Sequence, residues 1–386
     1  MAGSIRRRGK HSWEVAIRLG KDQVSGRYRR RFMAVVGTKR DAERALAEAI
    51  HLRDTGIDIQ PERLDVAAYL RRWLRDYAVH NVAAATLVRY TAIVERHLVP
   101  AIGSVKLIAL RPAHIQAAYS GALSEGGRVD GRSGGLSPRT VLQHHRVLRE
   151  ALKHAELWQL IPRNPADAVT PPRFPKKEIA ALSVEETRRL LEQAEGTAWY
   201  AIIYLAVASG ARLGELLALR WSDVDLDRGA MKIARSVQRI SGKGFIYSRP
   251  KTSGSSRAVA LSPETVRVLR EHRREQVELR LALGPDYEDG DLIFPWGNGR
   301  PLERGAVRTA LQKIARNAGL APPRFHDLRH TAATLMLASG VHPKIVAERL
   351  GHATIAVTLD TYSHVLPDMQ RDAAKLLDAI LRADGK

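Results

Sequence analysis

The chain has 386 residues, 45% hydrophobic and 27% charged, which is enough for two or three domains with their own cores and excludes wholesale disorder. Lys and Arg outnumber Asp and Glu by 62 to 41, and this formal net charge of +21 favours a polyanionic partner, nucleic acid first. Absence of cysteine excludes disulfides and thiolate metal sites, and no apolar run suits a signal peptide or membrane span, so we expect a cytoplasmic protein.

Residues 1–57 are predicted to form a small sheet covered by a helix. Large apolar side chains alternate with small or polar ones over residues 13–19, the period of a strand with one buried face. A second strand follows, and residues 42–50 carry one apolar stripe of a helix that can cover the sheet.

The second strand carries an alternating row of arginines. Arg27, Arg29 and Arg31 are predicted to point to the open face, with Tyr28 and Phe32 on the other. The first 40 residues hold 12 Lys or Arg against 2 acidic residues, about half of the net charge in a tenth of the chain. We therefore expect these three arginines to bind DNA, the alternative being a basic sheet that serves only solubility.

Residues 63–168 show helical patterns. Apolar residues repeat at three and four up to Pro100, which is predicted to end the second helix. After a glycine-rich loop, Ser137 and Pro138 suit the cap and first position of a long helix. Because closely spaced prolines follow, residues 169–179 are predicted to be an extended linker.

The last predicted domain, residues 180–386, is mixed. Helical patterns break at Gly210, a short antiparallel sheet is expected between Met231 and Leu261, and the remainder returns to helix. The expected fold is thus multidomain: a small sheet with a helix, an all-α domain, and a mainly helical α+β domain with a small antiparallel sheet.

Four segments of the last domain hold polar residues suited to phosphoryl transfer. They are Ser209–Leu216, Arg249–Thr252, His326–His330, and Leu350–His352 followed by Thr361–Tyr362. Together they resemble the signature of the tyrosine recombinase (phage integrase) family. The resemblance extends from about Leu182 to Val365 and includes Arg257–Leu261.

Tyr362, Arg212 and Arg329 carry the core of this chemistry. A phenol has a pKa near 10, so its activation as a nucleophile at neutral pH costs roughly 4 kcal/mol. Two guanidinium groups supply the charge and the forked donors that bind the non-bridging oxygens of a phosphate. Taken singly, each of these residues would be ordinary packing or an ion pair, and the combination makes the case.

The resemblance also implies roles for five further residues. Lys251 is the general acid that protonates the departing 5′ oxygen, His326 assists proton transfer and His352 donates to a phosphate oxygen. Glu215 orients its neighbours and His330 packs behind the site. A zinc site at His326 and His330 is the rival reading, which the intervening Arg329 disfavours because its charge repels a cation.

The family implies a site-specific recombinase that cuts and rejoins DNA through a 3′-phosphotyrosine, for integration or excision of a mobile element. Residues 63–168 resemble its helical core-site-binding domain, and residues 1–57 the arm-site-binding domain of some phage integrases. We expect no cofactor, metal or ATP, and a homo-tetramer on double-stranded DNA, joined by accessory DNA-bending or directionality proteins. The rivals are a type IB topoisomerase, a catalytically inactive architectural protein and a metal-dependent nuclease.

Overall fold

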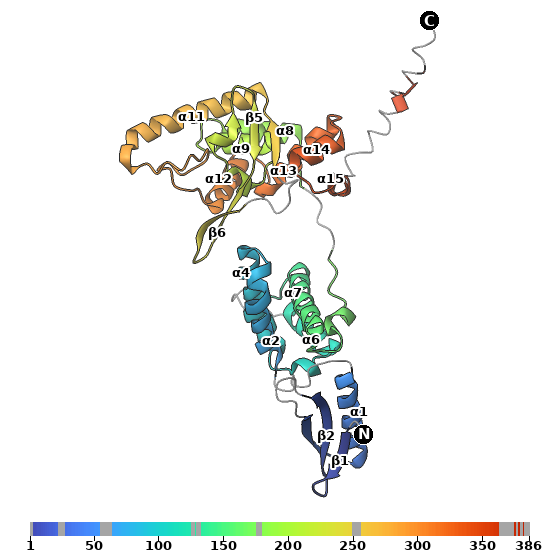
Figure 1. Ribbon diagram of the computed structural model, residues 1–386. Coiled ribbons are helices and arrows are strands. Elements are labelled where there is room, and N and C mark those ends of the chain that lie inside the picture. The colour runs from blue at the N-terminus through green and yellow to red at the C-terminus, as the bar shows by residue number, and fades with distance from the viewer. Residues whose placement is uncertain are drawn as a thin grey trace. The chain divides into compact units, whose positions relative to one another are not determined.

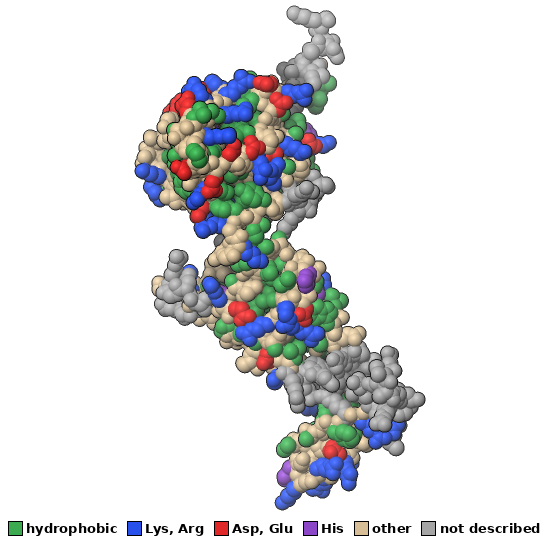
Figure 2. Space-filling model, turned by 60° about the vertical axis from the view of Figure 1, so that its left-hand side comes forward, with side chains coloured by type: hydrophobic (Ala, Val, Ile, Leu, Met, Phe, Trp, Pro, Cys, Tyr) green, Lys and Arg blue, Asp and Glu red, His purple; other side chains and the backbone are tan. Residues whose placement is uncertain are grey.

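A computed structural model describes residues 3–21, 28–54, 64–124, 128, 133–174, 180–248, 256–362, 374–375, 377–378 and 381. Contacts divide the chain into two compact units, residues 1–176 and 177–386 (Figure 1). On the face in Figure 2, Lys and Arg side chains are spread over both units and mix with acidic side chains on each. No helix among the described residues is long and apolar enough to cross a membrane.

The N-terminal sheet has the predicted combination of strands and helix. Its strands are antiparallel in the order β1 (Gly3–Arg7), β2 (Ser12–Lys21) and β3 (Tyr28–Val36), and α1 (Lys39–Asp54) contacts all three. Val15 and Ile17 of β2 are buried with Ala42 of α1, as the alternation over residues 13–19 predicts.

The open face of this sheet differs from the prediction. Phe32 pairs with Ala16, which lies on the face opposite the buried Val15, so the phenyl ring is 60% exposed instead of buried. Arg30, which pairs with Arg18, is exposed as well. Arg27 and the side chains of Arg29 and Arg31 lie outside the described residues.

The helices of residues 64–169 enclose one apolar core. They are α2 (Val66–Trp73), α3 (Val79–Asn81), α4 (Ala84–Ile93), α5 (Val99–Ile102), α6 (Pro112–Leu123) and α7 (Pro138–Leu157). Ser137 caps α7 and Pro138 occupies its first turn, as predicted.

Two π-helical turns lie inside these helices. One, η2 (Leu74–Ala78), joins α2 to α3, and the other, η3 (Val94–Leu98), joins α4 to α5. Pro100 therefore does not end its helix, contrary to the prediction. The wider turn just before it changes the hydrogen-bond spacing where proline offers no N–H, and the chain continues helically to Ile102. Short 3₁₀ turns follow at η4 (Leu107–Ala109) and η5 (Pro165–Ala168).

The C-terminal unit is mainly helical with two small antiparallel sheets, as predicted. The sheets have the orders β4-β5-β8 and β6-β7. The strands are β4 (Val224–Asp225), β5 (Ala230–Ile233), β6 (Ser236–Ile240), β7 (Gly244–Ser248) and β8 (Arg257–Ala260). The helices are α8 (Val184–Ala194), α9 (Tyr200–Ser209), α10 (Leu213–Leu216), α11 (Pro263–Leu283), α12 (Arg304–Asn317), α13 (Phe325–Ala338), α14 (Pro343–Leu350) and α15 (Ile355–Tyr362), with 3₁₀ turns η6 (Trp221–Asp223) and η8 (Gly284–Asp286).

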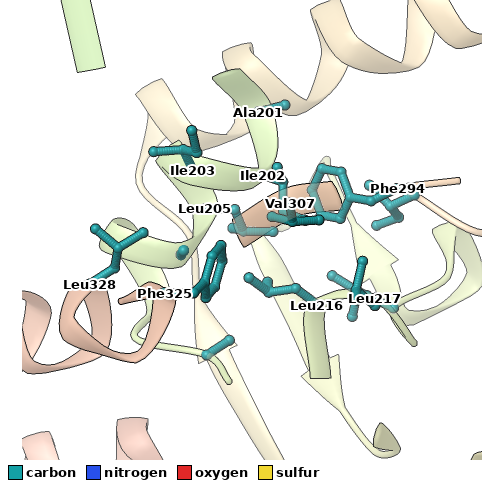
Figure 3. Packing of buried hydrophobic residues seen from close by; sticks show 14 of the residues in the cluster. Ala201, Ile202, Ile203, Leu205, Leu216, Leu217, Phe294, Val307, Phe325 and Leu328 are labelled. Carbon is teal, nitrogen blue, oxygen red and sulfur yellow. The ribbon is translucent and has the colours of Figure 1, made fainter. Parts of the chain in front are cut away.

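Helix α9 runs through the core of this unit. Its sequence is apolar on all sides, which is typical of a helix surrounded by protein. Ile202 and Leu205 lie in one cluster with Leu216, Val307 and side chains of α13 (Figure 3). Because α9, α10 and α13 share this core, their polar ends are held in fixed positions.

Candidate active site

Arg212 and Glu215 occupy the first turn of α10. The Arg212 backbone N–H and Nη1 each donate to the Glu215 carboxylate, both at 2.9 Å. This is the capping arrangement in which an acidic side chain three residues into a helix accepts the free N–H at its start. The Arg212 side chain keeps 41% of its surface exposed, so a ligand can reach it.

Arg257 binds the same carboxylate from β8. Its Nη2 lies 2.8 Å and its Nη1 3.3 Å from the two oxygens of Glu215, and the residue is buried. Burial raises the pKa of Glu215, but the hydrogen bonds from Arg257 and Arg212 have the larger, opposite effect. The pKa of Glu215 therefore lies below its ordinary value of 4.5. The carboxylate therefore stays charged at neutral pH, and its contribution to stability is lost only as the pH falls through that lowered pKa.

Arg257 also connects the strand to the end of α14. Its Nε donates to the carbonyl of Arg349 at 2.7 Å. Helix α14 ends at Gly351 with φ +68°, and a Cβ there would lie 2.9 Å from Arg257 Nη1. Glycine is thus required for both the left-handed turn and the close approach of the guanidinium, and the turn places His352 beside the site.

Arg329 is the most buried cation of the site, at 3% exposure, and lies on α13. Its Nη1 donates to the carbonyl of Gly210 at 2.8 Å, while its buried Nη2 has no partner. Burial, with the nearby charges of Arg212 and Arg257, lowers its pKa to about 9, so it remains protonated at neutral pH. A buried, charged donor without an acceptor is suited to an anionic ligand.

His330 and Tyr362 form a direct pair. His330 Nδ1 lies 2.8 Å from the Tyr362 phenol oxygen, and the tyrosine is only 1% exposed in a small cluster that includes Leu337 and Leu350. Burial raises the phenol pKa to about 12, although Arg329 opposes the rise. The tyrosine thus reaches the site from α15, which packs against α14 and meets α13 at His330 (Figure 1).

The other two predicted histidines also lie around Arg329. His326 contacts the His330 ring edge-on with centroids 4.8 Å apart, and His352 Nδ1 lies 2.7 Å from the Thr358 hydroxyl. Burial first, and then neighbouring positive charge, lowers the pKa of each to about 4, so both are neutral near pH 7. Among the residues described, no three His, Asp or Glu side chains are grouped to hold a metal ion.

Sequence reasoning located these residues unevenly. Lys251 lies outside the described residues, so its place remains a prediction. Arg257 was noted only as part of a family pattern, without a role, and Thr358 was missed because nothing in its spacing from His352 indicates a hydrogen bond. The long-range contacts of Glu215, Arg329 and His330 join residues that lie 42, 119 and 32 positions apart in the sequence.

Comparisons with known proteins place both parts of the chain in one family. Residues 180–369 match the Phage integrase family, and residues 66–123 match the Phage integrase, N-terminal SAM-like domain. The chain belongs to the phage integrase family. It is therefore a site-specific tyrosine recombinase that acts on DNA.

Similar proteins extend over nearly the whole chain. A "Tyrosine recombinase XerC-like" protein of Caldanaerobacter subterraneus is 26% identical over 96% of both chains, and an "Integrase" of Streptomyces ambofaciens is 27% identical over 97% of this chain and 94% of its own. The fold matches the Tn1549 transposon integrase in complex with a circular intermediate DNA, with TM-score 0.69, 19% identity and coverage of 81% and 99%. A lambda integrase dimer bound to a COC′ core site matches with TM-score 0.56, 19% identity and coverage of 93% and 94%.

The Arg257 network gives a first prediction. Arg257→Met should lower the free energy of unfolding by about 3 kcal/mol, because it leaves the buried Glu215 carboxylate with fewer donors. Urea denaturation measures the change. Arg267→Met is the matched control, since Arg267 makes exposed ion pairs with Glu264 and Glu271 and its loss should change stability little. Equal stability of the two variants would contradict the role given to Arg257.

Proposed function

We propose that this recombinase exchanges strands by attack of Tyr362 on a DNA phosphate, forming a 3′-phosphotyrosine. The observation that supports the assignment best is the unpartnered, buried Nη2 of Arg329 in the electrostatic neighbourhood of the Tyr362 phenol. A phosphate bound there would accept a hydrogen bond from Arg329 Nη2 and would also lie next to the Tyr362 nucleophile. The reaction conserves phosphodiester energy in the new bond, so a 5′ hydroxyl can reverse it without ATP.

The other site residues are assigned by what they can donate. Arg212 and Arg329 hold the non-bridging oxygens as negative charge builds, each contributing about 3 kcal/mol to transition-state stabilisation. His352 is positioned as a neutral donor, because the Thr358 hydroxyl can bond its Nδ1 and leave the Nε2 proton free. His326 assists proton transfer, and Lys251 protonates the 5′ oxygen as the family pattern implies. Because two guanidinium groups neutralise the phosphate, the proposed chemistry uses no metal.

The covalent step predicts the effect of one missing atom. Tyr362→Phe removes the attacking oxygen but keeps the ring that packs in the core, so DNA binding should persist while the protein–DNA adduct disappears. The adduct is measured on a nicked substrate in EDTA. Tyr204→Phe, at a half-buried tyrosine on α9, should keep wild-type adduct levels. An adduct undiminished in Tyr362→Phe would refute the nucleophile.

We further propose that the N-terminal sheet binds a separate, arm-type DNA site. Its open face presents Arg30 beside Arg18, with the exposed ring of Phe32 next to them. Arginine forks bind phosphate oxygens and base edges, and an apolar ring can contact thymine methyl groups. Arg27, Arg29 and Arg31 remain candidate contacts of the same unit, while the helices of residues 63–168 would bind the core site.

Charge removal on the two faces of this unit tests the proposal. Arg18→Ala with Arg30→Ala should weaken binding to the arm-type site and reduce its salt slope by about one unit per lost phosphate contact. Core-site cleavage should be unchanged. Arg40→Ala with Arg44→Ala removes the same charge from exposed positions of α1, the helix that covers the other face of the sheet. This double variant should change arm-site binding less. Equal losses from both pairs would mean that total charge, and no particular face, binds the DNA.

We propose a homo-tetramer on DNA, because exchange between two duplexes requires four strand breaks and each protomer supplies one Tyr362. After Tyr362, apolar residues follow at helical spacing from Leu366 to Ile380. This stripe would join neighbouring protomers, with accessory DNA-bending or directionality proteins completing the assembly. Most of this stripe lies outside the described residues. The protein would act in the cytoplasm, where the DNA of a bacterial host is found.

Assembly gives the next prediction. A chain truncated from Pro367 onward should still bind a single core site but recombine much more slowly, because the protomers are no longer linked. Native mass measurement of the synaptic complex gives the stoichiometry, and the full chain should show four protomers with two duplexes. A complex of two protomers and two duplexes that completes exchange would overturn the tetramer.

A further inference from the structure

The proposed reaction requires an acceptor for the proton of the Tyr362 phenol. As Tyr362 attacks phosphorus, its phenol must lose a proton, and with a pKa of about 12 only roughly one phenol in 100,000 is ionised at pH 7. An acceptor that is already in contact with the phenol oxygen removes the need for this rare ionised form.

One histidine occupies that position. Of the site histidines in the described part of the chain, His330 alone is bonded to the phenol oxygen, through Nδ1 at 2.8 Å. His352 Nδ1 is bonded to Thr358, and His326 contacts the His330 ring. Hydrogen bonding through Nδ1 as acceptor places the neutral ring's proton on Nε2.

We propose that His330 is a catalytic base, whose Nδ1 takes the phenol proton as the Tyr362 oxygen attacks phosphorus and returns it on religation. This inference rests on the proposed nucleophile. In cleavage, the bond from the phenol oxygen to phosphorus forms and the bond from phosphorus to O5′ breaks. The phenol proton moves to His330, and Lys251 supplies a proton to O5′. Religation reverses each transfer, so that protons and bonds balance.

The surroundings of His330 are suited to this transfer. Burial lowers its pKa, and Arg324, just before α13, and Arg329 on α13 act in that direction, so the ring is neutral and its lone pair is available. Asp327, one turn earlier, acts in the opposite sense and stabilises the imidazolium once it forms. His326 on α13 and Tyr362 on α15 are the other titratable neighbours. A bound phosphate would further offset the positive charge.

The decisive variant is His330→Gln, which keeps a hydrogen-bonding side chain but cannot take a proton. Cleavage of a nicked substrate and religation of the trapped adduct should both slow by about 100-fold or more. A catalyst of proton transfer acts on both directions equally, so the ratio of cut to joined DNA should stay unchanged. A residue that only positions Tyr362 would change that ratio, because it stabilises one state of the tyrosine over another.

The pH profile is a second readout. Wild-type cleavage should fall as the pH drops through the pKa of His330, which lies below its ordinary value of 6.5, because a protonated Nδ1 accepts nothing. The variant should lack this limb. His272→Gln is the matched control: it alters another half-buried histidine of the same unit, whose Nε2 lies 2.7 Å from the Ile293 carbonyl oxygen, and it should keep both rates and the limb.

A substrate with sulfur in place of O5′ separates the base from the acid, because a thiolate leaves without a proton. This substrate should relieve the defect of Lys251→Ala and leave that of His330→Gln in place. Rates of His330→Gln close to wild type, a changed ratio of cut to joined DNA, or relief by sulfur would each overturn the proposal. If Tyr362→Phe loses the adduct and one of these results is also found, the role of His330 is refuted and Tyr362 is still supported as the nucleophile. If Tyr362→Phe still forms the adduct, both assignments are refuted.

Discussion

A single buried carboxylate allows this site to hold several cations at close range. Burial and the charges of Arg212 and Arg257 lower the pKa of Arg329, and Glu215 is the anion that Arg212 and Arg257 bind directly. Without it, the guanidinium groups would repel one another in a region largely closed to water. The capping turn of α10 places this carboxylate, because the helix start needs an acceptor at that position.

The charge of Glu215 only partly compensates the positive charge of the site. Glu215 carries one negative charge against three guanidinium groups, and the Nη2 of Arg329 has no acceptor at all. The site of the free enzyme therefore carries excess positive charge, which a DNA phosphate can neutralise. In the proposed reaction, binding energy would then be directed to the phosphate oxygens on which negative charge grows.

The sequence was most informative where chemistry dictates residue types. The segments around Arg212, His326, Arg329, His352 and Tyr362 were found, and the structure brings them together. The sequence was least informative where contacts depend on residues far apart in the chain. The exposure of Phe32 follows from pairing with Ala16, and local alternation could not reveal which face α1 covers. Pro100 misled in the same way, because the π-helical turn before it has no sequence signature.

Those two π-helical turns have a meaning for how the chain can change. Such a turn is one residue longer than the α-helical turn it replaces, so it accommodates a single inserted residue without a loop. After residues 74–78 and 94–98 the helices continue, and apolar side chains such as Ile102 return to the same core. At these two places an alignment can gain or lose one residue while both helix ends stay where they were. Length variation among relatives thus need not be confined to the connections between helices.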